Sequence, residues 1–105
     1  MTLTRSQIKQ LRAEGHRLKL KPVVIIGQKG LSENLHAEID TALAHHELIK
    51  MRIPGLDKSS KKELCDLLCG QHDASLVESI GHVIVLYKRN PETDRYARIL
   101  KQALS

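Results

Sequence analysis

The fold is decided by ten residues, Pro22-Val23-Val24-Ile25-Ile26-Gly27-Gln28-Lys29-Gly30-Leu31, along which the spacing of apolar side chains changes. The residues before the glycines are mostly β-branched and predict a buried strand. From Leu31-Ser32-Glu33 onward, apolar residues recur every three or four positions, as they do in a helix. We therefore expect a strand, a short glycine loop and a helix in succession.

The glycine pair Gly27 and Gly30 has two explanations. Glycines let backbone N–H groups approach a phosphate, the helix N-terminus behind them adds partial positive charge, and Lys29 adds a full charge. Alternatively, the pair only provides a turn with positive φ, and a chain of this length contains roughly half of one Gly-x-x-Gly by chance. The place between strand and helix, the internal lysine and the basic surroundings favour phosphate binding.

The composition predicts one domain with an aliphatic core. The chain has 105 residues, of which 30 are Leu, Ile or Val, and it contains no Phe and no Trp. Its aromatic residues are Tyr87 and Tyr96. Because reading single-stranded bases by stacking needs exposed rings, we expect any RNA recognition to depend on phosphates and RNA shape.

Charge is segregated along the chain, which has a formal net charge of +5. Residues 5–21 and 50–62 carry net charges of +5 and +4, whereas residues 33–47 and 63–78 each carry −4. Such blocks predict one basic face that attracts polyanions. A mixed, solvated surface is the alternative.

Local signals predict the order α-β-α-β-α-β-β followed by an uncertain tail. The first expected elements are a helix from a Thr4-x-x-Gln7 capping box to Gly15 and a strand Leu18–Ile26 whose first part is half exposed. A helix capped by Ser32 or a neighbour, a strand Leu48–Ile53 and a helix from a Ser60-x-x-Glu63 capping box to Gly70 follow. The chain then forms strands Ser75–Ser79 and Val83–Tyr87 around the turn Ile80-Gly81-His82, and it ends in a tail 91–105 that is helical from Asn90-Pro91 or disordered. Pro22 favours a strand start or an edge strand. The fold class is therefore α/β, a compact single domain with a mixed sheet of about four strands.

Three blocks of the sequence together resemble the CRM domain, named for chloroplast RNA splicing and ribosome maturation. They are residues 20–31 with the glycine loop, residues 44–52 (Ala-His-His-Glu-Leu-Ile-Lys-Met-Arg) and residues 77–89 (Val-Glu-Ser-Ile-Gly-His-Val-Ile-Val-Leu-Tyr-Lys-Arg). The resemblance covers roughly residues 4–90 in order, and a free-standing domain of this length is similar to the bacterial YhbY-like branch. It implies a CRM-like domain over residues 1–90, while residues 91–105 match no family feature.

The resemblance also implies a fold similar to the C-terminal domain of translation initiation factor three. The implied partners are ribosomal RNA and the precursor large ribosomal subunit, in whose assembly the protein would act. The family's loop falls on Gly27, Gln28, Lys29 and Gly30. Basic residues that we expect to flank this loop and to contact RNA are Arg17, Lys19, Lys21, Lys50, Arg52, Lys88 and Arg89, preceded by Arg12. Lys50 and Arg52 share one side of their strand, opposite Ile49, Met51 and Ile53.

Other kinds of function have weaker support. The sequence has no Gly-x-x-x-x-Gly-Lys-Ser/Thr loop and no Gly-x-Ser-x-Gly elbow, so we expect neither an enzyme nor a cofactor. A zinc site from Cys65, Cys69, His72 and His82 matches no common finger spacing, and a Cys on a Leu-rich helix is more often part of the core. A ribosome-associated protein-interaction module without direct RNA contact, using His45, His46 and the apolar tail, is the remaining alternative.

The expected setting is the cytoplasm. No apolar run approaches ~20 residues, the N-terminus lacks the apolar stretch of a secretory signal, and two cysteines are compatible with a reducing compartment. One small basic domain is most simply a monomer without membrane contact.

Overall fold

The computed structural model describes residues 3–104, and in this part of the chain it contains four helices and four strands. These are α1 (Arg5–Arg17), β1 (Pro22–Ile25), α2 (Glu33–His46), β2 (Leu48–Arg52), α3 (Lys58–His72), β3 (Ser75–Ile80), β4 (Val83–Tyr87) and α4 (Ala97–Leu104). The predicted order of helices and strands is confirmed, and part of the tail is helical.

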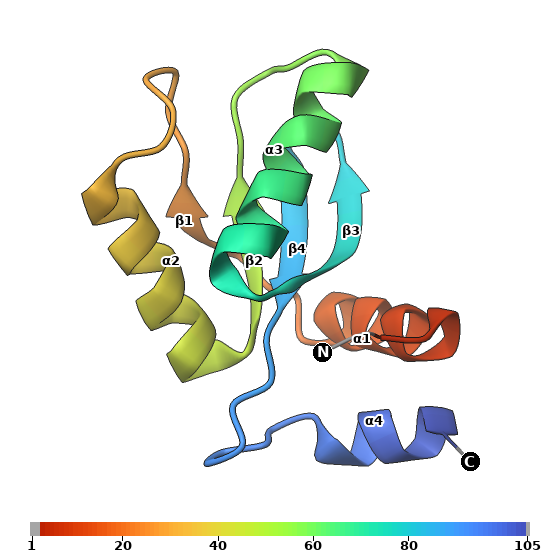
Figure 1. The fold of residues 1–105 in the computed structure, drawn as a ribbon. Coiled ribbons are helices and arrows are strands. Elements are labelled where there is room, and N and C mark those ends of the chain that lie inside the picture. The colour runs from red at the N-terminus through yellow and green to blue at the C-terminus, as the bar shows by residue number, and fades with distance from the viewer. Residues whose placement is uncertain (1–2, 105) are drawn as a thin grey trace.

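The strands form one mixed sheet of four strands, as predicted, and their order in the sheet is β1-β2-β4-β3. β1 pairs with β2 in parallel, and β4 pairs antiparallel with both β2 and β3. The carboxyl ends of β1 and β2 therefore lie beside the start of β4. We call this end of the sheet the loop end, and Figure 1 shows the β1–α2 loop and the start of α3 gathered there at the top.

The two faces of the sheet are covered unequally. One face packs against α2 and α3 through a core that includes Ile39, Met51, Leu68 and Ile84. On the opposite face, α1 and α4 cover the end remote from the loops, through the cluster Leu11, Leu48, Val77, Val85, Tyr87, Ile99 and Leu100. The rest of that face, which we call the open face, stays accessible, and Ile25 and Ile80 are each 63% exposed on it.

The expected first helix and strand differ from the observed ones at their junction. α1 continues through Gly15 to Arg17, and Leu18 and Lys19 donate backbone hydrogen bonds back to Glu14 and His16. Lys19 adopts φ +52°, so residues 18–21 are a tight turn rather than strand. A single glycine is tolerated inside a helix whose final carbonyls still find donors.

The β-branched run of β1 is half buried rather than fully buried. Val24 and Ile26 face the core, whereas Val23 is 47% exposed at the edge of the sheet beside α2, and Ile25 is exposed on the open face. β1 is an edge strand that is covered on one face only, and Pro22 is its first residue, as predicted.

The capping predictions succeed for α1 and α2 and fail for α3. Thr4 forms its capping box with Gln7, and the Ser32 hydroxyl accepts a hydrogen bond from the Leu35 N–H. α3, however, begins at Lys58, because the Asp57 carboxylate accepts from the Ser60 N–H at 2.9 Å. Hydrogen bonding from the Ser60 side chain, together with this backbone bond, lowers the pKa of Asp57. The helix also passes Gly70 and ends at His72, followed by Asp73 in the left-handed conformation.

Glu47 anchors the C-terminal segment. Its side chain is fully buried, and its carboxylate accepts hydrogen bonds from the Asn90 N–H, the Thr93 hydroxyl and the Arg95 N–H. Residues 90–96 therefore form a turn, and the last helix starts at Ala97 rather than at Asn90. The Gln7 amide donates to the Leu100 carbonyl, which ties α4 to α1.

We predict that Glu47→Ala destabilises the protein by roughly 3 kcal/mol in chemical denaturation, because three partly buried donors lose the buried carboxylate that accepts from them. Glu47 has φ +62°, a conformation that glycine adopts without strain. Glu47→Gly should therefore be about 1 kcal/mol less destabilised than Glu47→Ala. An alanine variant as stable as the parent would contradict the anchoring role.

Candidate nucleic-acid interface

The glycine loop is a β-turn at the loop end. The Gly30 N–H donates to the Gly27 carbonyl at 3.1 Å, and Gly30 adopts φ +80°. Gln28 and Lys29 form the exposed tip, where their backbone N–H groups and the Lys29 ammonium make no hydrogen bond to residues 3–104. Because the Gly30 N–H is used within the turn, the tip residues rather than Gly30 offer donors to an anion.

The start of α3 lies at the same end of the sheet as the turn. The Ile53 N–H donates to the His82 carbonyl at 2.8 Å, and the Lys61 ammonium donates to the Gly81 carbonyl at 2.7 Å. These bonds hold the β2–α3 segment against the β3–β4 turn. The N-termini of α2 and α3 thus both point toward the loop end (Figure 1), where their dipoles favour anions.

The first turns of α3 contribute cations that the predicted site omits. Lys58 and Lys62 are exposed there, and Lys62 pairs with Asp66 at 2.8 Å, which raises the pKa of Lys62. The only signal in the sequence was the basic block 50–62. This block alone could not show that α3 begins at the same end of the sheet as the glycine turn, because the end at which α3 begins depends on the direction of β2.

Lys50 and Arg52 lie on the open face, as the alternation in their strand predicts. Lys50 is opposite Pro22 and half buried, and Arg52 is opposite Ile25, exposed and nearer the loop end. Neither side chain forms an ion pair with the described residues. Two unpaired cations therefore follow β2 toward the glycine turn.

The prediction that the remaining basic residues flank the loop is wrong. Lys88 and Arg89 follow the carboxyl end of β4, which is antiparallel to β2, so they lie at the opposite end of the sheet. There the Arg89 guanidinium donates to both oxygens of Asp94 at 3.0 Å, and this raises the pKa of Arg89.

The N-terminal basic residues are also remote from the turn. Lys19 and Lys21 lie in the segment that leads into the start of β1, whereas Arg12 and Arg17 lie on α1, where Arg12 donates to the Val77 carbonyl of β3. Arg17 pairs with Glu14, and that hydrogen bond lowers the pKa of Glu14. Arg12 and Lys19, however, border the open face near α1.

The residues considered for zinc are used in packing. Cys65 is buried in the core, and burial raises the pKa of the Cys65 and Cys69 thiols. His72 bridges the helices instead, since its Nδ1 lies 2.6 Å from Asp40 Oδ1 and its Nε2 lies 2.8 Å from His36 Nδ1. Across the described residues 3–104, no three His, Cys, Asp or Glu side chains are grouped so as to hold a metal ion. Within the same residues, no helix is long and apolar enough to cross a membrane.

Comparison with known proteins gives consistent matches along the chain. The sequence pattern of the CRS1/YhbY (CRM) domain matches residues 3–88. A Pseudomonas aeruginosa protein named "Probable RNA-binding protein" is 40% identical over 95 residues, covering 90% of this chain and 89% of that protein. A Haemophilus influenzae protein named "RNA-binding protein" is 40% identical over 91 residues, covering 87% of this chain and 90% of the relative.

A solved structure shares the fold. The solution structure of a hypothetical Staphylococcus aureus protein, to which RNA binding is attributed, matches with a TM-score of 0.76 and 34% identity. The match covers 90% of this chain and 96% of the other.

We predict that the two glycines respond differently to alanine. Gly30→Ala should cost about 1 kcal/mol of stability, because Gly30 has φ +80°, a conformation that disfavours a Cβ. Gly27→Ala should change stability by less than about 0.5 kcal/mol, since Gly27 lies outside that region and its added Cβ meets no atom within 4 Å. Paired thermal melts measure both, and equal losses would contradict the turn geometry.

Proposed function

The chain belongs to the CRS1/YhbY (CRM) domain family, and from this premise we propose that it binds structured RNA through the loop end and open face of its sheet. The observation that carries the proposal is the tip of the glycine turn, where two N–H groups and the Lys29 ammonium are unpaired within the described residues. Arg52 at the end of the neighbouring strand and Lys58 at the start of α3 add positive charge at the same end of the sheet.

The distribution of aromatic residues favours contact with phosphates over stacking on bases. Tyr87 is buried, its ring packs edge-on against Tyr96, and burial raises the pKa of Tyr87 to about 12. Tyr96 is itself partly buried. Neither ring offers a free face as a stacking platform, so affinity would come mainly from phosphates and RNA shape.

The RNA we propose is ribosomal RNA within a precursor large subunit, and the role is in cytoplasmic assembly of that particle, by binding rather than catalysis. This extends what the relatives are named for, since their names mention RNA binding only. Cross-linking in cells should recover large-subunit ribosomal RNA above other RNAs, and the protein should co-sediment with large-subunit precursors. Recovery of messenger RNA without ribosomal enrichment would contradict the proposed role.

The salt dependence of binding to naked RNA tests the turn itself. Lys29→Ala removes one cation and should lower the slope of log affinity against log salt by about one unit, equally for different RNA sequences. Arg89→Ala is the matched control, because Arg89 is paired with Asp94 at the other end of the sheet and should leave the slope unchanged.

The alternative function, a protein-interaction module on the ribosome, gives a different result in the same experiment. Such a module would bind naked RNA weakly and without a steep salt term. An unchanged slope in Lys29→Ala, with the fold intact, would remove the glycine turn from the interface.

A further inference from the structure

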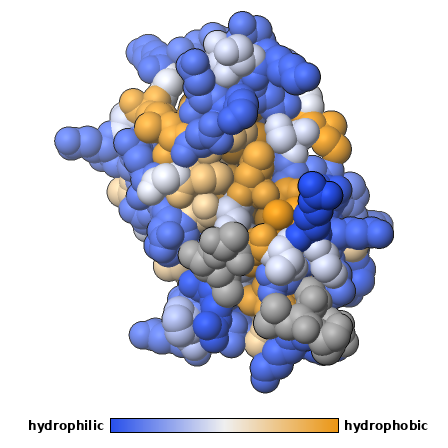
Figure 2. Space-filling view, turned by 45° about the vertical axis from the view of Figure 1, so that its right-hand side comes forward, coloured by the Kyte–Doolittle hydropathy of each residue, from blue (hydrophilic) through white to orange (hydrophobic). Residues whose placement is uncertain are grey.

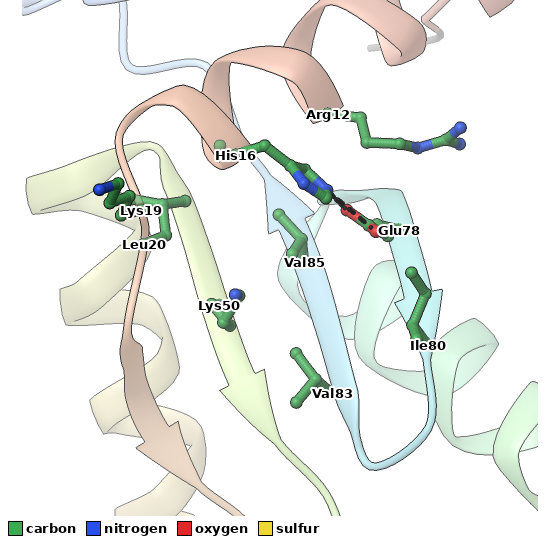
Figure 3. Close-up of a pocket in the computed structure, with 10 residues that line it drawn as sticks. Arg12, His16, Lys19, Leu20, Lys50, Glu78, Ile80, Val83 and Val85 are labelled. Atoms are coloured by element: carbon green, nitrogen blue, oxygen red, sulfur yellow. Dashed lines mark hydrogen bonds and ion pairs between the residues drawn. The ribbon is translucent and has the colours of Figure 1, made fainter.

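A pocket of about 360 Å³ opens on the open face between α1 and the sheet (Figure 3). Its floor is aliphatic and includes Leu20, Ile80, Val83 and Val85. The volume lies at the small end of the range for ligand sites, about 300–1,000 Å³. Figure 2 shows hydrophobic surface in the middle of the molecule with hydrophilic surface above and below, so apolar patches on this protein border charged ones.

The rim of the pocket is cationic. Lys19 and Lys50 come from different elements, and neither ammonium has a hydrogen bond or ion pair with residues 3–104. Arg12 extends beside β3 and donates to the Val77 carbonyl at 3.3 and 3.4 Å. Unpaired cations next to an apolar floor fit a ligand that carries an anionic group beside an apolar one.

The wall of the pocket carries a carboxylate, which would repel a ligand that consisted of an anionic group alone. The Glu78 side chain is 12% exposed, and its two oxygens lie 2.8 and 3.1 Å from His16 Nε2, as the dashed lines in Figure 3 mark. A carboxylate has about four acceptor positions, so Glu78 can still accept from N–H donors of a ligand. This combination distinguishes the pocket from a simple phosphate site.

We infer that the pocket receives one unpaired RNA nucleotide. Its base lies against the aliphatic floor, an exocyclic amino group of the base donates to Glu78, and the adjoining phosphate meets Lys50 and Lys19. An acidic peptide fits less well, because Glu78 would repel its carboxylates. The inference rests on the proposed function, since Lys50 and Arg52 continue along β2 from the pocket to the glycine turn.

The test compares two RNA hairpins that differ only by a single bulged cytidine. The parent protein should bind the bulged hairpin about tenfold more tightly than the fully paired one, because the bulged base adds apolar contact with the floor and a hydrogen bond to Glu78. Val83→Phe fills the pocket and should abolish this preference, so that the variant binds the two hairpins equally. Ile25→Phe is the matched control and should keep the preference, because Ile25 is exposed on the open face but does not line the pocket.

A second variant keeps the shape of the pocket. The parent should prefer a bulged cytidine to a bulged uridine, because the cytidine amino group donates to Glu78, and Glu78→Gln should weaken that preference by about tenfold. The comparison of bulged cytidine with bulged uridine tests the inference even if Val83→Phe does not fold. Equal binding of the two bulges by the parent overturns the inference.

The remaining outcomes separate the inference from the proposed function. If the parent binds neither hairpin, both are overturned. If it binds both equally, or if Val83→Phe weakens both to the same extent, the face contacts only backbone and the nucleotide pocket is overturned while RNA binding stands. If a polyglutamate peptide abolishes the preference as effectively as a bulged competitor RNA, the pocket is one for acidic protein segments.

Discussion

The parallel pairing of β1 and β2 is the constraint on which the candidate interface depends. Two neighbouring parallel strands cannot be joined by a tight turn, so α2 must carry the chain back across the sheet. Each of these strands is followed by a helix, and both helices therefore begin at the same end of the sheet. This places the glycine turn, the Asp57-capped start of α3 and its lysines at one end, although they are separated by up to about 30 positions in the sequence.

A chain of side-chain hydrogen bonds fixes the relative position of the two helices. His72 on α3 lies within hydrogen-bond distance of both His36 and Asp40 on α2, and the two imidazoles are stacked with centroids 5.0 Å apart. One proton serves the contact between the ring nitrogens, and the carboxylate accepts from the other side of His72. The contact joins the C-terminal end of α3 to the first turns of α2, and so it fixes how the two helices pack side by side on the sheet.

The opposite face of the sheet is only partly covered by helices. α1 and α4 bury one half of it with the help of Glu47, whose buried carboxylate binds the turn before α4. The other half keeps Ile25, Ile80 and the cations of β2 accessible. The same arrangement that stabilises the C-terminal segment thus leaves a charged and apolar surface next to the glycine turn.

The sequence by itself determined the order of the elements, the caps at Thr4 and Ser32, the strand start at Pro22, the turn at Gly27–Gly30 and the family, because these depend on signals within a few residues. The tertiary structure alone decided which charges meet. Lys58 lies at the same end of the sheet as the glycine turn and Arg89 at the other, since strand direction rather than sequence distance sets the ends of the sheet. The tertiary structure likewise moved the start of the last helix to Ala97, because Glu47 binds residues more than 40 positions away. Local propensity does not predict such long-range hydrogen bonds, because they become strong only when folding buries the groups that make them.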